Sequence, residues 1–173
     1  MKRILIAYFS RADENYFGGA LRYIKVGNTE VVVNLMKEDV QADVFKIEMQ
    51  QPYAADYKTC IAEAKEDLRK KVRPALKQDL ASIADYDTVI LAYPNYWGTI
   101  PMVVATFLEV HDFSGKTILP LCTNEGSGMG GSECMIAALA KGATVKKGLS
   151  IIGSEAASAG PRVKAWLHGN GIA

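Results

Sequence analysis

The sequence of 173 residues contains little cysteine and little histidine. Its three cysteines, Cys60, Cys122 and Cys134, are odd in number and lack the spacing of metal or redox motifs. This pattern excludes a disulfide framework and favours reduced thiols in a cytoplasm. The two histidines stand alone, with no carboxylate or hydroxyl at a spacing typical of catalysis. We therefore expect a cytoplasmic protein that has no bound metal and no catalytic histidine.

An excess of charge and a long hydrophobic run are also missing. The 20 Lys and Arg residues nearly balance the 19 Asp and Glu residues, and no basic stripe is present, which excludes nucleic acid as a partner. The apolar run Ile4–Phe9 is too short for a signal peptide, and no stretch approaches the length of a membrane span. The length and the 49% hydrophobic content indicate one soluble globular domain, residues 1–173.

The common nucleotide-binding motifs are absent as well. Gly27-Asn28-Thr29 lacks the lysine that lets a Walker motif reach the outer phosphates of a triphosphate. The glycine pattern that admits a pyrophosphate in dinucleotide-binding folds is also missing. A single terminal phosphate is therefore the more natural ligand for this segment.

Short apolar runs alternate with helical patterns along the whole chain. The run at 88–93 is β-branched, does not alternate and is bounded by turn residues, which is typical of a strand covered on both faces. The other expected strands are 3–9, 42–48 (an edge strand), 116–122 and 145–152, and the expected helices begin at 27–30 and cover 53–73, 101–112, 132–141 and 161–169. Right-handed crossovers then give an α/β fold, a doubly wound parallel sheet with helices on both faces.

The long connection after the first strand, residues 11–26, leads into a helix start that suits a phosphate. Asn28 or Thr29 is a good N-cap, and the hydroxyls of Ser10 and Thr29 lie near free backbone N–H groups. Helix capping alone would account for the same residues. The cationic side chains of this connection, Arg11, Arg22 and Lys25, either neutralise the phosphate or face solvent.

The loops after the third and fourth strands provide the rest of the candidate site. Pro94 cannot continue the ladder of its strand, and Tyr96 and Trp97 form either a wall for a flat ring or a cap on the core. The loop 123–132 has four glycines in ten residues, so its backbone approaches a ligand closely. This second loop has no aromatic residue, and it would leave one face of a bound ring open to a stacking substrate.

These motifs, in this order, resemble the flavodoxin family, specifically the branch with a lengthened first loop. The resemblance covers the whole chain and is carried by residues 8–11 with 27–29, by 94–98, by 112–117 and by Thr123 with 125–128. It implies a three-layer α/β fold with a five-stranded parallel sheet in the order 2-1-3-4-5 and FMN at the switch point, the arrangement that flavodoxin exemplifies.

The resemblance also implies roles for individual residues. Ser10, Asn28 and Thr29, with Arg11 and Gly27, would hold the FMN phosphate. One side of the isoalloxazine ring would contact Pro94, Asn95, Tyr96, Trp97 and Gly98. The polar edge of the ring would meet Thr123, Asn124, Glu125, Gly126, Ser127 and Gly128, mainly through backbone groups. Asn124 stands where this branch often has a histidine, and Glu125 is the one formal charge of the segment.

Three functions remain open from the sequence. The first is a flavodoxin that passes electrons between protein partners through non-covalently bound FMN. The second is an NAD(P)H-dependent FMN reductase of a quinone or another small acceptor, and the third is a non-redox ligand-binding module. The nearly neutral charge weakens the carrier reading, because an acidic rim would speed docking on electropositive partners. We expect a redox partner protein or a small-molecule acceptor, and either a monomer or a homodimer.

Overall fold

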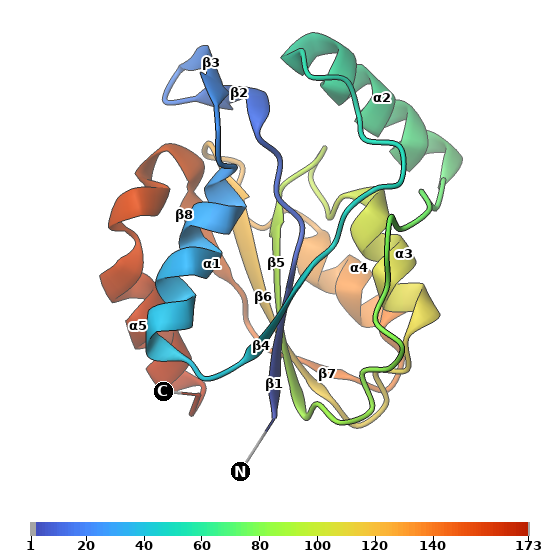
Figure 1. The fold of residues 1–173 in the computed structure, drawn as a ribbon, viewed down its shortest axis with the longest axis vertical. Helices are drawn as coiled ribbons and strands as arrows, with labels where there is room; N and C mark the ends of the chain where they lie inside the picture. The colour runs from blue at the N-terminus through green and yellow to red at the C-terminus, as the bar shows by residue number, and fades with distance from the viewer. Residues whose placement is uncertain (1–2, 173) are drawn as a thin grey trace.

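A sheet of parallel strands runs through the centre of the computed structural model, which describes residues 3–172 (Figure 1). Its strands are β1 (Ile4–Tyr8), β4 (Asp43–Lys46), β5 (Thr88–Pro94), β6 (Thr117–Asn124), β7 (Thr144–Val145) and β8 (Leu149–Ile152). They lie in the order β4-β1-β5-β6, and both β7 and β8 pair with the free edge of β6. The predicted order 2-1-3-4-5 is confirmed, with two short strands in the last position.

The last strand, expected over 145–152 with an interruption at Gly148, is two short strands, and Gly148 lies between them. β7 pairs with β6 at Ile118 and β8 pairs with it at Leu121, so the ladder is interrupted opposite Pro120. Proline has no N–H group to donate there. Gly148 packs so closely on this point that a Cβ atom would lie 2.9 Å from the Pro120 carbonyl oxygen.

Helices cover both faces of the sheet. In Figure 1, α1 (Asn28–Asp39) and α5 (Gly160–Gly169) lie on one side, and α3 (Met102–Val110) and α4 (Ser132–Leu139) lie on the other. Neighbouring strand residues enter two separate cores: Leu5 and Leu91 pack towards the α3 side, whereas Ile6 and Ile90 pack towards the α1 side. No helix within residues 3–172 is both long and apolar enough to cross a membrane.

Three predicted helix ends are corrected. The N-cap of α1 is Gly27, not Asn28 or Thr29, and it makes no side-chain capping bond. The helix α2 (Tyr57–Lys70) is shorter than the predicted 53–73: the Asp56 carboxylate caps its start by accepting from the Thr59 N–H at 2.8 Å. It ends at Lys71, which has a left-handed backbone at φ 54°, before Pro74 is reached.

The connection after β1, residues 11–26, contains a β-hairpin that was not predicted from the sequence. β2 (Asp13–Phe17) and β3 (Ala20–Ile24) pair in antiparallel fashion, and Gly18 and Gly19 form the turn with φ of 60° and 92°. A two-residue turn of this kind needs positive φ at both positions, which glycine adopts without strain. The hairpin and α2 stand on opposite sides of the same end of the sheet (Figure 1).

Candidate functional site

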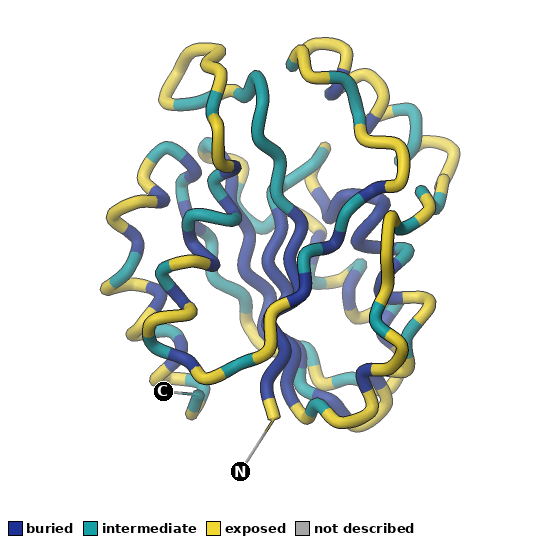
Figure 2. Tube along the Cα trace, viewed as in Figure 1, coloured by how far each residue is buried: buried dark blue, intermediate teal, exposed yellow. Residues whose placement is uncertain are grey.

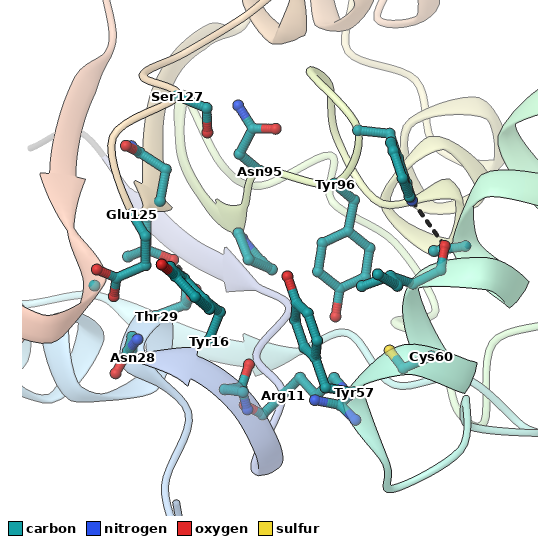
Figure 3. Close-up of a pocket in the computed structure, with 18 of the residues that line it drawn as sticks. Arg11, Tyr16, Asn28, Thr29, Tyr57, Cys60, Asn95, Tyr96, Glu125 and Ser127 are labelled. Atoms are coloured by element: carbon teal, nitrogen blue, oxygen red, sulfur yellow. Dashed lines mark hydrogen bonds between the residues drawn. The ribbon is translucent and has the colours of Figure 1, made fainter. Parts of the chain in front are cut away.

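A pocket of about 440 Å³ lies at the carboxyl ends of β5 and β6, between the hairpin and α2 (Figure 3). This is the edge of a doubly wound sheet at which ligands usually bind. The pocket brings together the three segments that the sequence marked as a site. Of the predicted site residues, those that line it are Arg11, Asn28, Thr29, Pro94, Asn95, Tyr96, Trp97, Gly98, Thr123, Asn124, Glu125 and Ser127.

Four predicted site residues do not line the pocket: Ser10, Gly27, Gly126 and Gly128. Ser10 lies beside the start of α1, where its Oγ atom accepts a hydrogen bond from the Glu30 N–H at 3.1 Å. Gly27 allows this approach, because a Cβ atom there would lie 2.2 Å from Ser10 Oγ. Ser10 therefore supplies the capping interaction that the sequence assigned to Asn28 or Thr29.

The start of α1 presents polar groups to the pocket from a well-packed position. Thr29 is only 1% exposed, and its Oγ1 atom shares a hydrogen bond of 2.8 Å with Thr123 Oγ1 at the end of β6. The first N–H that bonds back within this turn belongs to Val31, which donates to the Gly27 carbonyl at 3.1 Å. The N–H groups of Asn28 and Thr29 precede it and have no acceptor inside the helix.

The Arg11 guanidinium is largely engaged within the protein, which leaves it less free to bind an anionic ligand. Its guanidinium donates to the backbone carbonyls of Glu14, Ala54 and Ala55, with the last two at 2.9 and 2.8 Å. These bonds join the base of the hairpin to the segment that leads into α2. The guanidinium thus holds these two segments together at the rim of the pocket.

Pro94 belongs to β5, contrary to the expectation that it leaves the ladder. It lies opposite Thr123 of β6, and the next residue, Asn95, donates its N–H to the Thr123 carbonyl at 2.8 Å. Because N–H groups of alternate residues point to the same neighbouring strand, the N–H that Pro94 lacks would face β1. β1 ends at Tyr8, and the Phe9 N–H makes a further bond to the Ala92 carbonyl at 3.0 Å, so Pro94 lies at the very end of the paired stretch.

Asn95 fixes the 94–98 loop and ties it to the glycine-rich loop. Its Oδ1 atom accepts from the Gly98 N–H at 2.8 Å, and its Nδ2 atom donates to the Gly128 carbonyl at 2.9 Å. A second tie runs from the Gly131 N–H to the Gly98 carbonyl, also at 2.8 Å. The two loops therefore form one connected rim of the pocket.

The two aromatic residues of the 94–98 loop have different surroundings. Tyr96 packs edge-on against Phe9, with ring centroids 5.9 Å apart, and its buried hydroxyl has no hydrogen-bond partner within residues 3–172. Burial raises the pKa of Tyr96 well above its usual value. Trp97 is 47% exposed, and its Nε1–H donates to the Ile61 carbonyl of α2 at 2.8 Å. Figure 3 shows the Tyr96 ring in the pocket, with its hydroxyl towards α2.

Asn124 is the last residue of β6, not a loop residue, and its side chain holds the glycine-rich loop in shape. Its Oδ1 atom accepts from the N–H groups of Gly126 and Gly128 at 2.9 and 3.0 Å, and its Nδ2 atom donates to Ser150 Oγ at 2.8 Å. Thr123, its neighbour, also lies within β6. The N–H groups of Gly126 and Gly128 are therefore already occupied, so they do not point into the pocket as free donors.

Glu125 lies at the pocket wall, where it is half-buried and hydrogen-bonded. Its carboxylate accepts from the Ser154 N–H at 2.8 Å and from Ser154 Oγ at 3.0 Å, at the start of the 3₁₀ helix η1 (Gly153–Ser158). Gly153 leaves room for the Glu125 carboxylate, because a Cβ atom there would lie 3.0 Å from Glu125 Oε1 and 2.4 Å from Asn28 Nδ2. Glu125 thus joins the glycine-rich loop to the segment beside α1.

Other lining residues were not predicted as site residues. They come mostly from the hairpin and α2: Asn15, Tyr16, Tyr57, Cys60, Ile61, Ala64 and Gly153. Burial raises the pKa of Cys60 and of Tyr57, so both side chains are kept neutral. The glycine pair 18–19 was a usable signal for the hairpin. The helical spacing of Tyr57, Ile61 and Ala64 indicates an apolar face of α2, but periodicity does not tell a face that lines a pocket from one that enters the core.

Comparisons with known proteins agree with this architecture. The family profile described as Flavodoxin matches residues 3–170. A provisionally assigned flavoprotein of Bacteroides eggerthii DSM 20697 is 26% identical, with a TM-score of 0.78 and coverage of 100% of both chains. A provisionally assigned flavoprotein of Bacteroides uniformis ATCC 8492 is 27% identical, with a TM-score of 0.75 and coverage of 96% of this chain and 98% of that one.

A more distant structure shares the fold alone. A flavoprotein of Lactobacillus acidophilus NCFM, solved in complex with FMN, is 15% identical, with a TM-score of 0.62 and coverage of 90% of this chain and 96% of that one. No curated protein matches the sequence.

Proposed function

This chain belongs to the flavodoxin family, and from that premise we propose that it is a redox protein that binds FMN non-covalently in the pocket between the hairpin and α2. The observation that carries the proposal is the meeting of three unlike surfaces in one pocket: a helix start, an aromatic loop and a glycine-rich loop. FMN has three matching parts, namely a phosphate, a flat ring and the polar edge of that ring.

The start of α1 suits the phosphate. A helix N-terminus carries partial positive charge and N–H groups without intrahelical acceptors. The Ser10 hydroxyl, which does not line the pocket, accepts a bond from the Glu30 N–H and so supports this turn from behind. Of the paired Thr29 and Thr123 hydroxyls, the one that accepts keeps a free proton. These groups fit a phosphate without a lysine, and they make Arg11, which is engaged with backbone carbonyls, dispensable for direct contact.

The opposite part of the pocket suits the ring. Tyr96 and Trp97 give it an apolar wall, and Asn95 and Asn124 hold the two rim loops in shape through the bonds described above. The Ser127 N–H has no acceptor within residues 3–172, which leaves it free for a carbonyl of the ring edge. When bound, FMN would supply the redox chemistry, while this chain would orient it and limit the access of water.

The test is a visible spectrum of the purified protein, supplemented with FMN if it is colourless. We expect saturable binding with a flavin absorption band. Anaerobic NADH or NADPH is then added to the FMN-loaded protein. Rapid bleaching supports a reductase of a quinone or another small acceptor, and bleaching only by dithionite or a partner reductase supports an electron carrier. A protein that binds no FMN at any concentration contradicts the proposal and leaves a non-redox binding module.

A further inference from the structure

The hairpin presents an open sheet edge along β3. Its turn has two residues, so Phe17 and Ala20 form the first hydrogen-bonded pair of the ladder. The backbone groups then alternate in direction, and the N–H and C=O groups of Leu21 and Tyr23 point away from β2. Neither residue makes a backbone hydrogen bond on that side within residues 3–172. β3 therefore carries unpaired donors and acceptors in the geometry to which another strand can pair.

The other edge of the hairpin is already covered. Glu14 of β2 stands opposite Tyr23 in the register, so its N–H also points outward, and it donates to the Ala55 carbonyl at 3.2 Å. The Glu14 carboxylate accepts from the Tyr57 N–H at 2.9 Å, at the start of α2. The hairpin is thus joined to the α2 side along β2 and open along β3. Since a two-stranded ribbon is marginally stable by itself, a further strand would stabilise it.

Exposed apolar side chains gather on the same ribbon. Tyr23 is 71% exposed and Leu21 is 43% exposed, and Tyr16 and Val26 are exposed as well. Figure 2 shows the hairpin exposed or half-buried along its whole length. Leu21 and Tyr23 lie on one face of β3, because they are two positions apart in a strand. An edge with an apolar stripe and without a proline or a bulge is open to the addition of a strand.

The charges on β3 select the kind of strand that fits. Arg22 and Lys25 have no ion-pair partner within residues 3–172, and the Arg22 guanidinium lies over the Phe17 ring, 5.6 Å from its centroid. The Asp13 carboxylate of β2 accepts from the Tyr23 hydroxyl at 2.8 Å, so it pairs with neither cation. β3 has no acidic residue, and a second copy paired along this edge would bring like charges onto one sheet. An acidic segment meets opposite charges instead.

We propose that the β3 edge binds an extended acidic segment of a partner protein, which adds to the hairpin as a further strand. Backbone bonds to Leu21 and Tyr23 hold the segment, and its apolar side chains pack on the same two residues. Its carboxylates pair with Arg22 on the other face and with Lys25 after the end of β3. Because Leu21 stands opposite Tyr16, which lines the pocket, the partner is docked beside the pocket. This surface needs no flavin, so it is tested separately from the proposed function.

The probe is a short fluorescent peptide of alternating valine and glutamate, titrated by fluorescence anisotropy. We expect saturable binding to wild type that weakens as salt is added. The same peptide with lysine in place of glutamate, or with methyl groups on its backbone nitrogens, should not bind, because it lacks the charges or the donors. Amide hydrogen exchange at Leu21 and Tyr23 should slow when the acidic peptide is bound, since both N–H groups gain an acceptor.

Two pairs of variants test the backbone and the charges. Tyr23→Pro removes the outward N–H and keeps the ladder bonds to β2, while its matched control Tyr23→Ala removes the ring alone. We expect the proline variant to bind the peptide about fivefold to tenfold more weakly than the alanine variant. Arg22→Glu/Lys25→Glu should abolish binding of the acidic peptide. Lys141→Glu/Lys147→Glu makes the same change in net charge at two exposed lysines outside the hairpin and should bind as wild type does.

Several outcomes would overturn the proposal. Wild type that does not bind the acidic peptide does so, and so does equal binding after charge reversal or after Tyr23→Pro. A wild-type dimer in sedimentation velocity that Tyr23→Pro dissociates would place a second copy on the edge. Binding of phosphatidylserine vesicles that charge reversal abolishes and Tyr23→Pro leaves intact would place a bilayer there.

The test does not depend on one variant or on the flavin. If Tyr23→Pro does not fold, the methylated peptide tests the same backbone bonds from the side of the partner, and its binding as tightly as the unmethylated peptide would overturn strand addition. FMN binding is measured in parallel. Wild type that binds the acidic peptide but no FMN contradicts the proposed function and supports the docking edge.

Discussion

The two sides of the pocket are built differently. On the α1 side, a helix of 12 residues buries Thr29, Val32, Val33 and Met36 against the sheet. On the α2 side, a helix of 14 residues buries only Cys60 and Ala64. Figure 2 shows the same contrast: the strands form a continuous buried band, while the hairpin and α2 are largely half-buried or exposed.

The contrast extends to the interactions that hold each side. The α1 side is fixed by core packing, which is cooperative with the whole fold, whereas the α2 side is fixed by hydrogen bonds such as Trp97 to Ile61 and Glu14 to Tyr57. Segments with few buried apolar contacts open at low free-energy cost. The α1 side is thus the rigid foundation of the pocket, and the α2 side is the part that we expect to move without unfolding the sheet.

The largest expected effect is a difference in the free energy of unfolding between a variant of α1 and a variant of α2. Met36→Ala removes a fully buried side chain from α1, and we expect it to lower the free energy of unfolding by about 2–5 kcal/mol. Ile61→Ala removes a half-buried side chain from α2 and should cost clearly less, about 1 kcal/mol. Urea unfolding followed by circular dichroism measures both. Equal losses of stability would show that α2 is as much a part of the core as α1, which would contradict the difference between the two sides of the pocket.

Burial and periodicity explain which part of the fold was predictable. The run at 88–93 read as an interior strand because it is apolar on both faces, and β5 is buried from Thr88 to Tyr93. The hairpin was not predicted, because β2 and β3 are short, half-buried or exposed, and rich in polar residues, so no apolar pattern marks them. Its one signal was the glycine pair of the turn, which depends on backbone conformation and not on hydrophobicity.

The residues of the candidate site also divide into those that the sequence predicts and those that it does not. Residues at or just after strand ends, such as Thr123 and Tyr96, were predictable because parallel strands bring their carboxyl ends to one edge. Tyr16 and Tyr57 were not, since their meeting depends on hydrogen bonds between residues 43 positions apart, such as Glu14 to Tyr57. The hydrogen bonds of Asn124 to its own loop were also not predictable, because a side chain that holds its loop has the same sequence signature as one that faces a ligand.

A second prediction concerns the buried hydroxyl pair of the α1 side. Thr29→Val keeps the shape but leaves Thr123 Oγ1 without its partner, at an expected cost of about 1–3 kcal/mol in stability. The double variant Thr29→Val/Thr123→Val removes both polar groups and should recover part of that loss. Urea unfolding of the four proteins in the cycle measures the coupling. If the two single losses simply add in the double variant, the hydroxyls do not depend on each other.

The same variants also probe the phosphate. If one hydroxyl of the pair donates to it, the double variant should bind FMN about tenfold more weakly or worse, because a hydrogen bond to a charged group contributes about 1.5–3 kcal/mol. Riboflavin, which has no phosphate, should bind with unchanged affinity. A parallel loss for both ligands would place the phosphate elsewhere.

The smallest expected effect tests the α2 side through the two tryptophans of the chain. Trp97 Nε1–H donates to the Ile61 carbonyl at 2.8 Å, and Trp166 Nε1–H of α5 donates to the Lys147 carbonyl at 3.3 Å. Each Trp→Phe variant removes one neutral hydrogen bond, which contributes about 0.5–1.5 kcal/mol. Because few apolar contacts hold α2, Trp97→Phe should speed amide hydrogen exchange along α2 and the hairpin and leave α1 and α5 unchanged. Trp166→Phe is the matched control, and it should alter exchange only near α5 and β8. If Trp97→Phe instead speeds exchange in α1, the two sides of the pocket open together and the hydrogen bonds of α2 belong to the same cooperative unit as the core.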